Sequence, residues 1–380
     1  MSLPFLRLRP PMRLLALSIV SFLCMYFVYN SVYNVNKAAL DDNQDASSNQ
    51  QWQYTAPTTL HQPNPNLNAA MVTFVRGDRG TMQKLRNTMR NIEDSFNEHH
   101  GYPYIIFTDE DLSTEFKELV SSTTKGDVIF EKVGKDYYGY PKGIDKKKAA
   151  QARIDLKDVM FGDSEDYRFN SRFLAGTIFR HPALENMDYY WRIEAGTEYV
   201  CPIAFDPFQY MKDHNKKVSF SMALYEYHET LPTLWNTVKA FADEHPEWVT
   251  DKTEGSGSLW PFVTDGNSGD FNRCHFWSNF QIADLSFFRG EQYQAYFNYL
   301  DQSGGFFYER WGDPVVHTLA MVLFLKKEEV HHWDDIGYSV ANFFIHCPND
   351  KSLWSKCTCR PEKNFAYNPY SCFPWFERAT

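Results

Sequence analysis

The stretch Ala69-Ala70-Met71-Val72-Thr73-Phe74-Val75-Arg76-Gly77-Asp78 decides the fold. Its first seven residues form a short, mainly apolar run that predicts a buried strand, and the last three predict a turn. Apolar side chains then recur every three or four positions, which predicts an amphipathic helix, at Met82, Leu85, Met89, Ile92 and Phe96. A strand, a turn and a helix in this order begin an α/β unit.

The same alternation continues downstream. Residues 102–107 and 127–133 are predicted strands, and residues 113–121 between them are a predicted helix. Alternation of this kind predicts a mainly parallel sheet covered by helices. Ligands of such sheets bind beyond the carboxyl ends of the strands, which points to Arg76 and Asp109. The chain has no GxGxxG and no Walker A motif, so the common dinucleotide and ATP sites are not supported.

The second half of the chain extends this α/β domain. Further strands are predicted at residues 189–194, 218–226 and 275–285, and helices at 291–300 and 313–325. No internal repeat or convincing domain break follows Ala69, so residues 69–380 are predicted to be one domain.

The residues before this domain predict its compartment. Three arginines in residues 1–13 precede residues 14–36, which carry no charge and are just long enough to span a bilayer. A cleavable signal peptide is the alternative, but no clear small-x-small site follows Tyr29, which favours an uncleaved anchor. Residues 37–68 are polar and predict a disordered stem. A cytoplasmic tail, a signal anchor, a stem and a luminal domain are typical of a single-pass type II Golgi membrane protein.

Cysteine usage agrees with an oxidising lumen. Six cysteines lie beyond the predicted anchor: Cys201, Cys274, Cys347, Cys357, Cys359 and Cys372. They predict three disulfides, for which 15 pairings are possible, and these would pin the C-terminal tail. The pair Cys357 and Cys359 is too closely spaced for a zinc knuckle.

Composition narrows the range of functions. The net charge is −10, and such an acidic chain is a poor candidate for binding nucleic acid. Aromatic residues make up 17% of the chain, which predicts a large core rather than a disordered protein. Aromatic ring faces also suit the apolar faces of sugars.

Two acids stand out as candidates for chemistry. Glu194 ends a predicted strand, where a lone carboxylate facing a cleft can hold Mg²⁺ or Mn²⁺ bridging a diphosphate. The alternative is a surface ion pair between Glu194 and Arg192. Asp313 precedes a predicted helix, where it would either cap the first-turn amides or hold an acceptor hydroxyl.

Several longer motifs resemble one known family. They are Asp166-Tyr167-Arg168, Tyr190-Trp191-Arg192-Ile193-Glu194, Cys274-His275-Phe276-Trp277-Ser278-Asn279-Phe280, residues 304–313, Asp334-Asp335-Ile336-Gly337-Tyr338 and Tyr370-Ser371-Cys372. With them the chain resembles the fungal Golgi alpha-1,2-mannosyltransferases of glycosyltransferase family 15. The resemblance implies a GT-A-like fold that binds GDP-mannose with Mn²⁺. It also implies transfer of mannose, with retention, to a mannose 2-hydroxyl of protein-linked glycans.

The resemblance assigns roles to individual residues. Glu194 matches the metal-binding acid of the family, Glu226 an acid beside the reacting sugar, and Asp313 the acid that meets the acceptor. The positions matched to donor contacts are Arg76, Tyr167 and Arg192. The acceptor itself, whether an N-linked chain, an O-linked chain or a glycolipid, stays open.

Two positions depart from the family pattern. Gln281 stands where the family has its proposed glutamate nucleophile, and an amide cannot act as that nucleophile. Where the family carries a histidine near the metal, this chain has Ser339 and Val340, and His346 is a nearby substitute. These departures leave two interpretations. The chain is either a working hexosyltransferase or a catalytically silent member that binds glycan or associates with related transferases.

Overall fold

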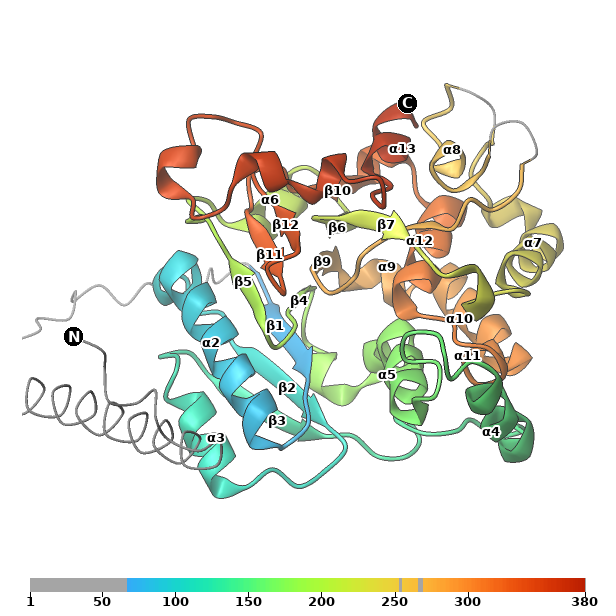
Figure 1. Ribbon diagram of the computed structural model, residues 1–380, viewed down its shortest axis with the longest axis horizontal. Coiled ribbons are helices and arrows are strands. Elements are labelled where there is room, and N and C mark those ends of the chain that lie inside the picture. Colours follow the sequence, from blue (N-terminus) through green and yellow to red (C-terminus); the bar gives the residue numbers. More distant parts are fainter. Residues whose placement is uncertain (1–66, 253–254, 266–268, 380) are drawn as a thin grey trace, which may run out of the picture. The chain divides into compact units, whose positions relative to one another are not determined.

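The computed structural model describes residues 67–252, 255–265 and 269–379, which lie in one compact unit (Figure 1). The predicted tail, anchor and nearly all of the stem fall outside these residues. Within the described ranges, no helix has both the length and the apolar surface needed to cross a membrane. Leu67 and Asn68 were assigned to the stem, but Leu67 is buried and Asn68 hydrogen-bonds Asp188, so the fold includes both.

A seven-stranded sheet forms the centre of the domain. Its order is β10-β6-β9-β4-β1-β2-β3. The strands are β1 (Ala69–Phe74), β2 (Tyr104–Thr108), β3 (Val128–Lys132), β4 (Tyr189–Arg192), β6 (Val218–Phe220), β9 (Gln281–Asp284) and β10 (Val330–His332). β9 runs antiparallel to β4 and β6, and every other pair of neighbours is parallel. The predicted mainly parallel sheet is therefore confirmed, and the antiparallel β9 makes it a mixed one.

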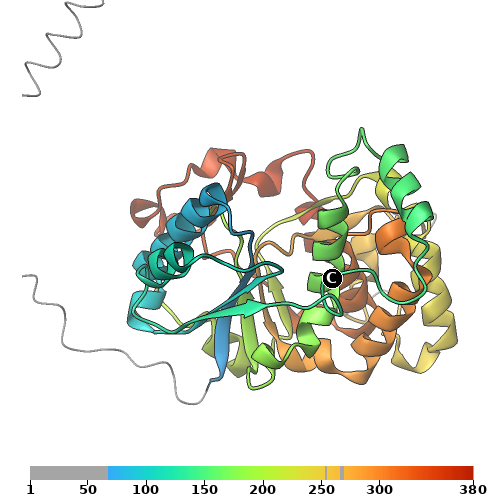
Figure 2. The same cartoon turned by 90° about the horizontal axis from the view of Figure 1, so that it is seen from below.

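Helices cover both faces of this sheet (Figures 1 and 2). Alternation along β1 shows why: Met71 packs into one apolar cluster, whereas Ala70 and Val72 pack into the other. The Met71 cluster includes the apolar faces of α2 (Arg79–Ser95) and α3 (Thr114–Ser121). The opposite cluster includes α5 (Glu165–Ala175), α10 (Glu291–Ser303) and α12 (Asp313–Phe324).

Two predicted strands are each two strands in the structure. Residues 218–226 contain β6 and then β7 (Ala223–Tyr225), which leaves the main sheet. Residues 275–285 overlap β8 (Cys274–Phe276) and contain β9. β7 and β8 pair with each other in a separate antiparallel sheet. The single-strand predictions were wrong because an apolar run shows that a segment is extended, not which partner it joins.

A third sheet holds the C-terminal part against the domain. It has the antiparallel order β12-β11-β5, formed by β12 (Phe344–His346), β11 (Tyr338–Val340) and β5 (Thr197–Tyr199). The other α-helices of the described residues are α4 (Lys146–Asp155), α6 (Pro207–Asp213), α7 (Leu234–Glu244), α8 (Trp260–Val263), α9 (Leu285–Arg289), α11 (Gly305–Tyr308) and α13 (Phe373–Arg378).

All six predicted luminal cysteines form disulfides. The pairs are Cys201–Cys357, Cys274–Cys372 and Cys347–Cys359. Two of them join the tail to residues far upstream, across 156 and 98 residues. The prediction that disulfides pin the C-terminal tail is confirmed, and the chain-entropy model expects cross-links of this span to stabilise the fold.

Candidate functional site

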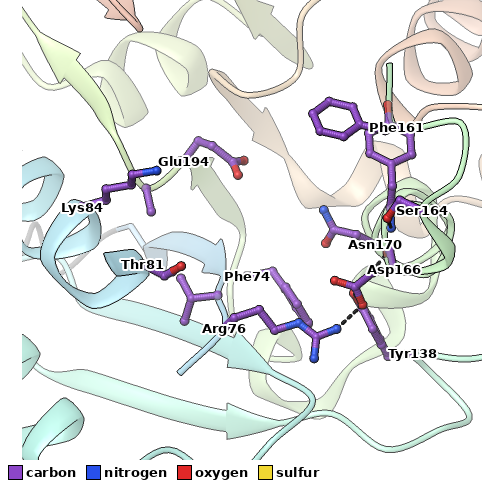
Figure 3. A pocket seen from close by; sticks show the side chains of 13 residues that line it. Phe74, Arg76, Thr81, Lys84, Tyr138, Phe161, Ser164, Asp166, Asn170 and Glu194 are labelled. Carbon is purple, nitrogen blue, oxygen red and sulfur yellow. Dashed lines mark hydrogen bonds and ion pairs between the residues drawn. The ribbon is translucent and has the colours of Figure 1, made fainter. Parts of the chain in front are cut away.

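A pocket of about 330 Å³ opens beyond the carboxyl ends of β1 and β4 (Figure 3). β2 lies on one side of β1 and β4 on the other, so the pocket occupies the point where strand order changes direction, the usual ligand position in open α/β sheets. We call it the donor pocket. It is lined by Phe74, Val75, Arg76, Thr81, Lys84, Tyr138, Phe161, Ser164, Asp166, Tyr167, Asn170, Glu194 and Ala195.

Glu194 is held in the donor pocket by a tight turn after β4. The Thr197 amide donates to the Glu194 carbonyl, and Gly196 has φ +97°, a conformation that favours glycine. The Thr88 hydroxyl accepts from the Gly196 amide at 3.0 Å and so ties the turn to α2. The turn therefore fixes the backbone from which the Glu194 carboxylate enters the pocket.

The Glu194 carboxylate is accessible but surrounded by protein. Its side chain is 43% exposed, and Oε2 lies 3.4 Å from Nη2 of Arg192. Burial raises the pKa of Glu194 above its ordinary value; Arg192 opposes this shift and Asp313 adds to it. Both interpretations of Glu194 made from the sequence fit this geometry, because it pairs with Arg192 and still faces the pocket.

Arg76 forms the opposite wall (Figure 3). As its position after β1 predicts, it meets Asp109 at the end of β2, with 2.8 Å between Nη1 and Oδ1. It also pairs with Asp166 from α5, whose carboxylate accepts from the Tyr138 hydroxyl at 3.1 Å. Arg76, Tyr138 and Asp166 also line an adjoining pocket of about 640 Å³. Together the two pockets provide room for a ligand larger than a single sugar.

Tyr167 closes the donor pocket from α5. Ser164 caps this helix by accepting from the Tyr167 amide at 3.0 Å. The Tyr167 ring stacks on Phe161, with centroids 5.0 Å apart, and the Arg310 guanidinium lies 4.9 Å from the ring centroid. Burial raises the pKa of the Tyr167 hydroxyl to about 12, so the phenol stays neutral.

Glu226 lies behind Arg310. Its Oε1 accepts from Nη2 of Arg310 at 2.9 Å and from the Tyr227 amide at 2.8 Å. Tyr167 and Glu226 are far apart in the sequence. Arg310 joins them into one cluster, because its guanidinium lies over the Tyr167 ring and donates to Glu226. Glu226 does not line the donor pocket.

A closed charge network lies beneath Glu194. Asp313 pairs with Nη1 of Arg192 and accepts from the Ser278 hydroxyl at 2.5 Å, and Ser278 also accepts from Arg192 at 2.7 Å. Asp313 and Ser278 are both buried. Burial alone would lower the pKa of Arg192, but the negative charges of Asp313 and Glu194 together have the larger effect and raise it. The prediction that Asp313 caps the helix was wrong. Gly312 is the N-cap of α12, and the Asp313 carboxylate pairs with the Arg192 guanidinium instead.

A sequence profile of the family described as "Glycolipid 2-alpha-mannosyltransferase" matches residues 28–379. The chain belongs to this mannosyltransferase family. It is 36% identical to alpha-1,2 mannosyltransferase KTR1 of Saccharomyces cerevisiae over 370 residues, covering 96% of this chain and 92% of that protein. It is 40% identical to glycolipid 2-alpha-mannosyltransferase 2 of Candida albicans, covering 80% of this chain and 65% of that protein. The chain thus spans slightly less than two thirds of the Candida protein.

Solved structures of the mannosyltransferase family have the same fold. The Mn/GDP form of core-mannan synthase A from Aspergillus fumigatus superposes with a TM-score of 0.76 at 34% identity, covering 84% of this chain and 87% of that one. The complex of Saccharomyces cerevisiae Ktr4p with GDP superposes with a TM-score of 0.77 at 28% identity, covering 86% of both chains. The GT-A-like α/β architecture expected from the sequence is therefore confirmed.

Gln281, at the family's nucleophile position, lies behind the donor pocket. It is the first residue of β9, directly opposite Arg192 in β4, and it is 1% exposed. Its side-chain oxygen accepts from the Tyr190 hydroxyl, which is also buried. Gln281 does not line the pocket, so in this arrangement it supports the strand rather than facing a ligand.

Val340 and His346 lie on neighbouring strands of the small sheet. Val340 pairs in register with Thr197, the last residue of the Glu194 turn, so an aliphatic residue lies opposite the end of that turn. His346 is buried; its Nε2 contacts the Asp334 carbonyl at 3.1 Å and its ring packs against His332. His346 does not line the donor pocket, and no contact with Glu194 is present among the described residues.

Sequence reasoning missed several lining residues. Asn170 is one of them, although the spacing of Asp166, Tyr167 and Asn170 along α5 would have placed all three on one face. No sequence pattern marks Lys84 or Tyr138 as pocket residues, because Lys84 belongs to the polar face of α2 and Tyr138 to a loop. Arg168 belongs to a family motif but is structural: it donates to the carbonyls of Ser164 and Glu309.

The donor pocket supplies too few ligand atoms to hold a divalent cation by itself, so a bound substrate would have to supply the others. Glu194 offers one accessible carboxylate, a hard oxygen donor suited to Mg²⁺ or Mn²⁺. Asp313 is engaged by Arg192, and Val340 offers no donor atom. Such cations are commonly held by one or two carboxylates together with substrate phosphates and water, so this donor set suits a cation bridged to a diphosphate.

Proposed function

We propose that this protein is a retaining alpha-1,2-mannosyltransferase that moves mannose from GDP-mannose to a mannose 2-hydroxyl of protein-linked glycans. Family membership and the 34% identity to a protein solved with Mn and GDP support the donor and the Mn²⁺ cofactor. The observation that carries the proposal is the exposed Glu194 carboxylate at the switch point of the sheet, inside a pocket with space beside it for a nucleotide.

The chain's own residues would do three things in this reaction. Glu194 would hold the cation, which supplies positive charge to the leaving diphosphate. Arg76 and Tyr167 would both line the donor, and the buried Asp313 would keep Arg192 oriented beneath Glu194. Holding groups in position and stabilising developing charge are large terms in enzyme catalysis.

Retention does not require a nucleophile from the enzyme. The sugar can pass through an oxocarbenium-like ion pair while the departing diphosphate takes the proton of the acceptor hydroxyl on the same face. The C1–O bond to the diphosphate breaks, a C1–O bond to the acceptor forms, and the proton moves to the diphosphate. This route suits Gln281, which is buried and hydrogen-bonded to Tyr190.

The second candidate is a catalytically silent family member that binds glycan or assists a related transferase. The specific observation that favours it is Val340 beside the Glu194 turn, together with Gln281 at the nucleophile position. Loss of two useful groups at one site is what relaxed catalytic demand would produce.

We place the catalytic domain in the Golgi lumen, anchored by residues 14–36 as a single-pass type II protein. Three disulfides support an oxidising compartment, because such bonds are rare in the cytosol. Expression of a full-length chain with tags at either terminus, followed by protease treatment of sealed vesicles, tests this topology. Only the N-terminal tag should be cleaved, and cleavage of the C-terminal tag would contradict it.

Transfer by the purified full-length chain tests the activity. With GDP-mannose, Mn²⁺ and mannobiose we expect a trisaccharide, and Glu194→Ala should lower kcat/KM by about 10²–10³ because the charge-stabilising centre is lost. The matched control is Glu198→Ala, since Glu198 is an exposed acid outside the donor pocket and only four residues further along the chain. Its rate should stay close to that of the wild type.

Two other results would decide between the candidates. No product, together with no Mn²⁺-dependent binding of GDP, would support the silent member. Product formed equally well by Glu194→Ala would leave the enzyme standing but remove Glu194 from its mechanism.

A further inference from the structure

A further pocket, separate from the two described above, is lined by Glu226. Its volume is about 370 Å³, within the range of small-ligand sites, which is about 300–1,000 Å³. We call it the tyrosine pocket. It is lined by Tyr225, Glu226, Tyr227, His228, Glu229, Arg273 and Tyr370.

Three distant segments build the tyrosine pocket and are tied together. The Cys372 amide donates to the Ala223 carbonyl at 2.9 Å, which joins the C-terminal segment to β7. The Cys274–Cys372 disulfide joins that segment to β8. The Glu226 amide donates to the Arg273 carbonyl at 3.0 Å, which closes the third side. The pocket is therefore preformed by covalent and backbone bonds rather than by loose side chains.

Aromatic rings face solvent in the tyrosine pocket. Tyr227 is 40% exposed and Tyr370 is 37% exposed, whereas more than half of the aromatic rings in the described residues are buried. Tyr225 lies edge-on to Tyr370 with centroids 6.2 Å apart, and the Trp375 indole fixes its hydroxyl by donating at 2.7 Å. Rings of this kind combine an apolar face with a polar edge, which suits a ligand with both characters.

The charged groups narrow the chemistry of the ligand. Oε1 of Glu226 is used by Arg310 and Tyr227, but Oε2 accepts no hydrogen bond from the described part of the chain. The exposed Glu229 adds a second carboxylate and Arg273 a guanidinium, so the lining offers both hydrogen-bond acceptors and donors rather than the net positive charge that a phosphate requires. A neutral polyol offers hydroxyl donors for the carboxylates and C–H faces for the rings. A pyranose has both.

The tyrosine pocket also lies next to the donor pocket. Glu226 lines the tyrosine pocket and binds Arg310, and Arg310 lies over the ring of Tyr167, which lines the donor pocket. Glu226, Arg310 and Tyr167 therefore form a row of side chains between the two pockets. A glycan that enters the reaction site with one residue can therefore place another residue on the tyrosines.

We propose that the tyrosine pocket binds a mannosyl ring of the acceptor glycan other than the ring that receives mannose. The proposal rests on the proposed transferase function for the identity of the sugar. It makes Tyr227 and Tyr370 determinants of acceptor length: a disaccharide reaches the pocket and a monosaccharide does not.

Binding of mannobiose to the full-length chain, in the absence of GDP-mannose, tests the proposal apart from catalysis. Isothermal titration should show binding to the wild type and an affinity at least about fivefold weaker for Tyr370→Ala, the scale expected when a central aromatic contact is removed. Tyr370→Phe should keep most of the affinity because the ring remains. The matched control is Tyr367→Ala, a 66% exposed tyrosine in the same tail that bonds Asn349 and does not line the pocket.

Transfer kinetics provide the second readout. In Tyr370→Ala the KM for mannobiose should rise more than the KM for methyl α-mannoside, so the preference for the longer acceptor falls. Tyr227→Ala should behave in the same way and serves if Tyr370→Ala does not fold, which thermal unfolding will report.

Each outcome separates the two proposals. Mannobiose binding that Tyr370→Ala weakens supports the subsite even if no mannose is transferred. Transfer by the wild type with unchanged mannobiose affinity and preference in both tyrosine variants would overturn the subsite and leave the enzyme standing. A wild-type chain that does not bind mannobiose would overturn it as well.

Discussion

The donor pocket and the charge network beneath it use the same residue types in opposite ways. At the wall that the donor pocket shares with the adjoining pocket, Arg76 and Asp109 form an ion pair with 37% and 26% exposed side chains, open to solvent and to ligand. In the network, Arg192 and Asp313 form an ion pair with 9% and 7% exposed side chains, closed by Ser278. Strand β4 joins them, because it carries Arg192 and leads to Glu194 two residues later. The difference separates residues that meet the ligand from residues that hold them in position.

Asp313→Ala should break the network with the largest effect on stability. Removing one partner of a buried ion pair typically costs about 3–5 kcal/mol, and here it leaves the buried Arg192 guanidinium with Ser278 and a longer contact to the more exposed Glu194. We expect the free energy of unfolding, measured by urea denaturation, to fall by about that amount. Transfer activity should fall with it, because Arg192 also contacts Glu194.

The exposed pair supplies the control for this comparison. Asp109→Ala should change the free energy of unfolding by only about 0.2–1 kcal/mol, since solvent screens the Arg76 charge and Asp166 still pairs with it. Equal losses in the two variants would contradict the division between an open pocket and a closed network.

Acid should weaken the network side of the molecule through His317. This buried histidine lies near Asp313, its Nε2 contacts the Leu174 carbonyl at 3.1 Å, and burial lowers its pKa to about 4. In the unfolded chain this histidine binds a proton near pH 6.5, whereas in the folded protein it does so only near pH 4. The contribution of neutral His317 to the stability of the fold is therefore complete above pH 6.5 and is lost as the pH falls from 6.5 towards 4. The pKa difference corresponds to about 3 kcal/mol.

His317→Gln should flatten this pH dependence. Glutamine keeps an N–H donor for the Leu174 carbonyl but does not titrate, so urea denaturation between pH 6.5 and pH 4 should show a decline smaller by about 3 kcal/mol. The exposed His228 is the matched control, and His228→Gln should leave the decline unchanged. If the free energy of unfolding of His317→Gln declined with pH as much as that of the wild type, the decline would belong to other titrating groups.

The first half of the fold could be predicted from sequence because its signals are local. β1, α2, β2, α3 and β3 follow one another in the chain and pair with near neighbours, so periodicity alone finds them. The second half depends on distant partners. β9 enters between β4 and β6, and β7 leaves the main sheet for β8, which no local pattern encodes.

The same reasoning applies to the candidate site. Glu194 and Arg76 could be found because the ends of apolar strands mark the ligand edge of an α/β sheet. The pairing of Arg192 with Asp313 joins residues 121 positions apart, and no local pattern favours this pairing over a helix cap. The resemblance to a family located Gln281, but only packing shows that it is buried against Tyr190.

Gln281→Glu should have the smallest effect and is the sharpest test of mechanism. A carboxylate nucleophile would need to reach the anomeric carbon, whereas this side chain is 1% exposed behind the donor pocket and bonded to the Tyr190 hydroxyl. Introducing the glutamate that the family has at this position should therefore not raise kcat with GDP-mannose and mannobiose. Gln83→Glu makes the same chemical change on the exposed side of α2 and controls for added charge.

The two mechanisms predict opposite results for that variant. If transfer proceeds through an ion pair, Gln281 belongs with Arg192 and Asp313 to the part that holds β4 in place. A carboxylate there adds a third acid near Arg192, after Asp313 and Glu194, without gaining access to the sugar. If transfer proceeds by double displacement, the wild type lacks its nucleophile and Gln281→Glu should raise kcat by tenfold or more, about 1.4 kcal/mol of barrier. A rise of that size would move Gln281 from the closed network to the open pocket and require β9 to shift when the donor binds.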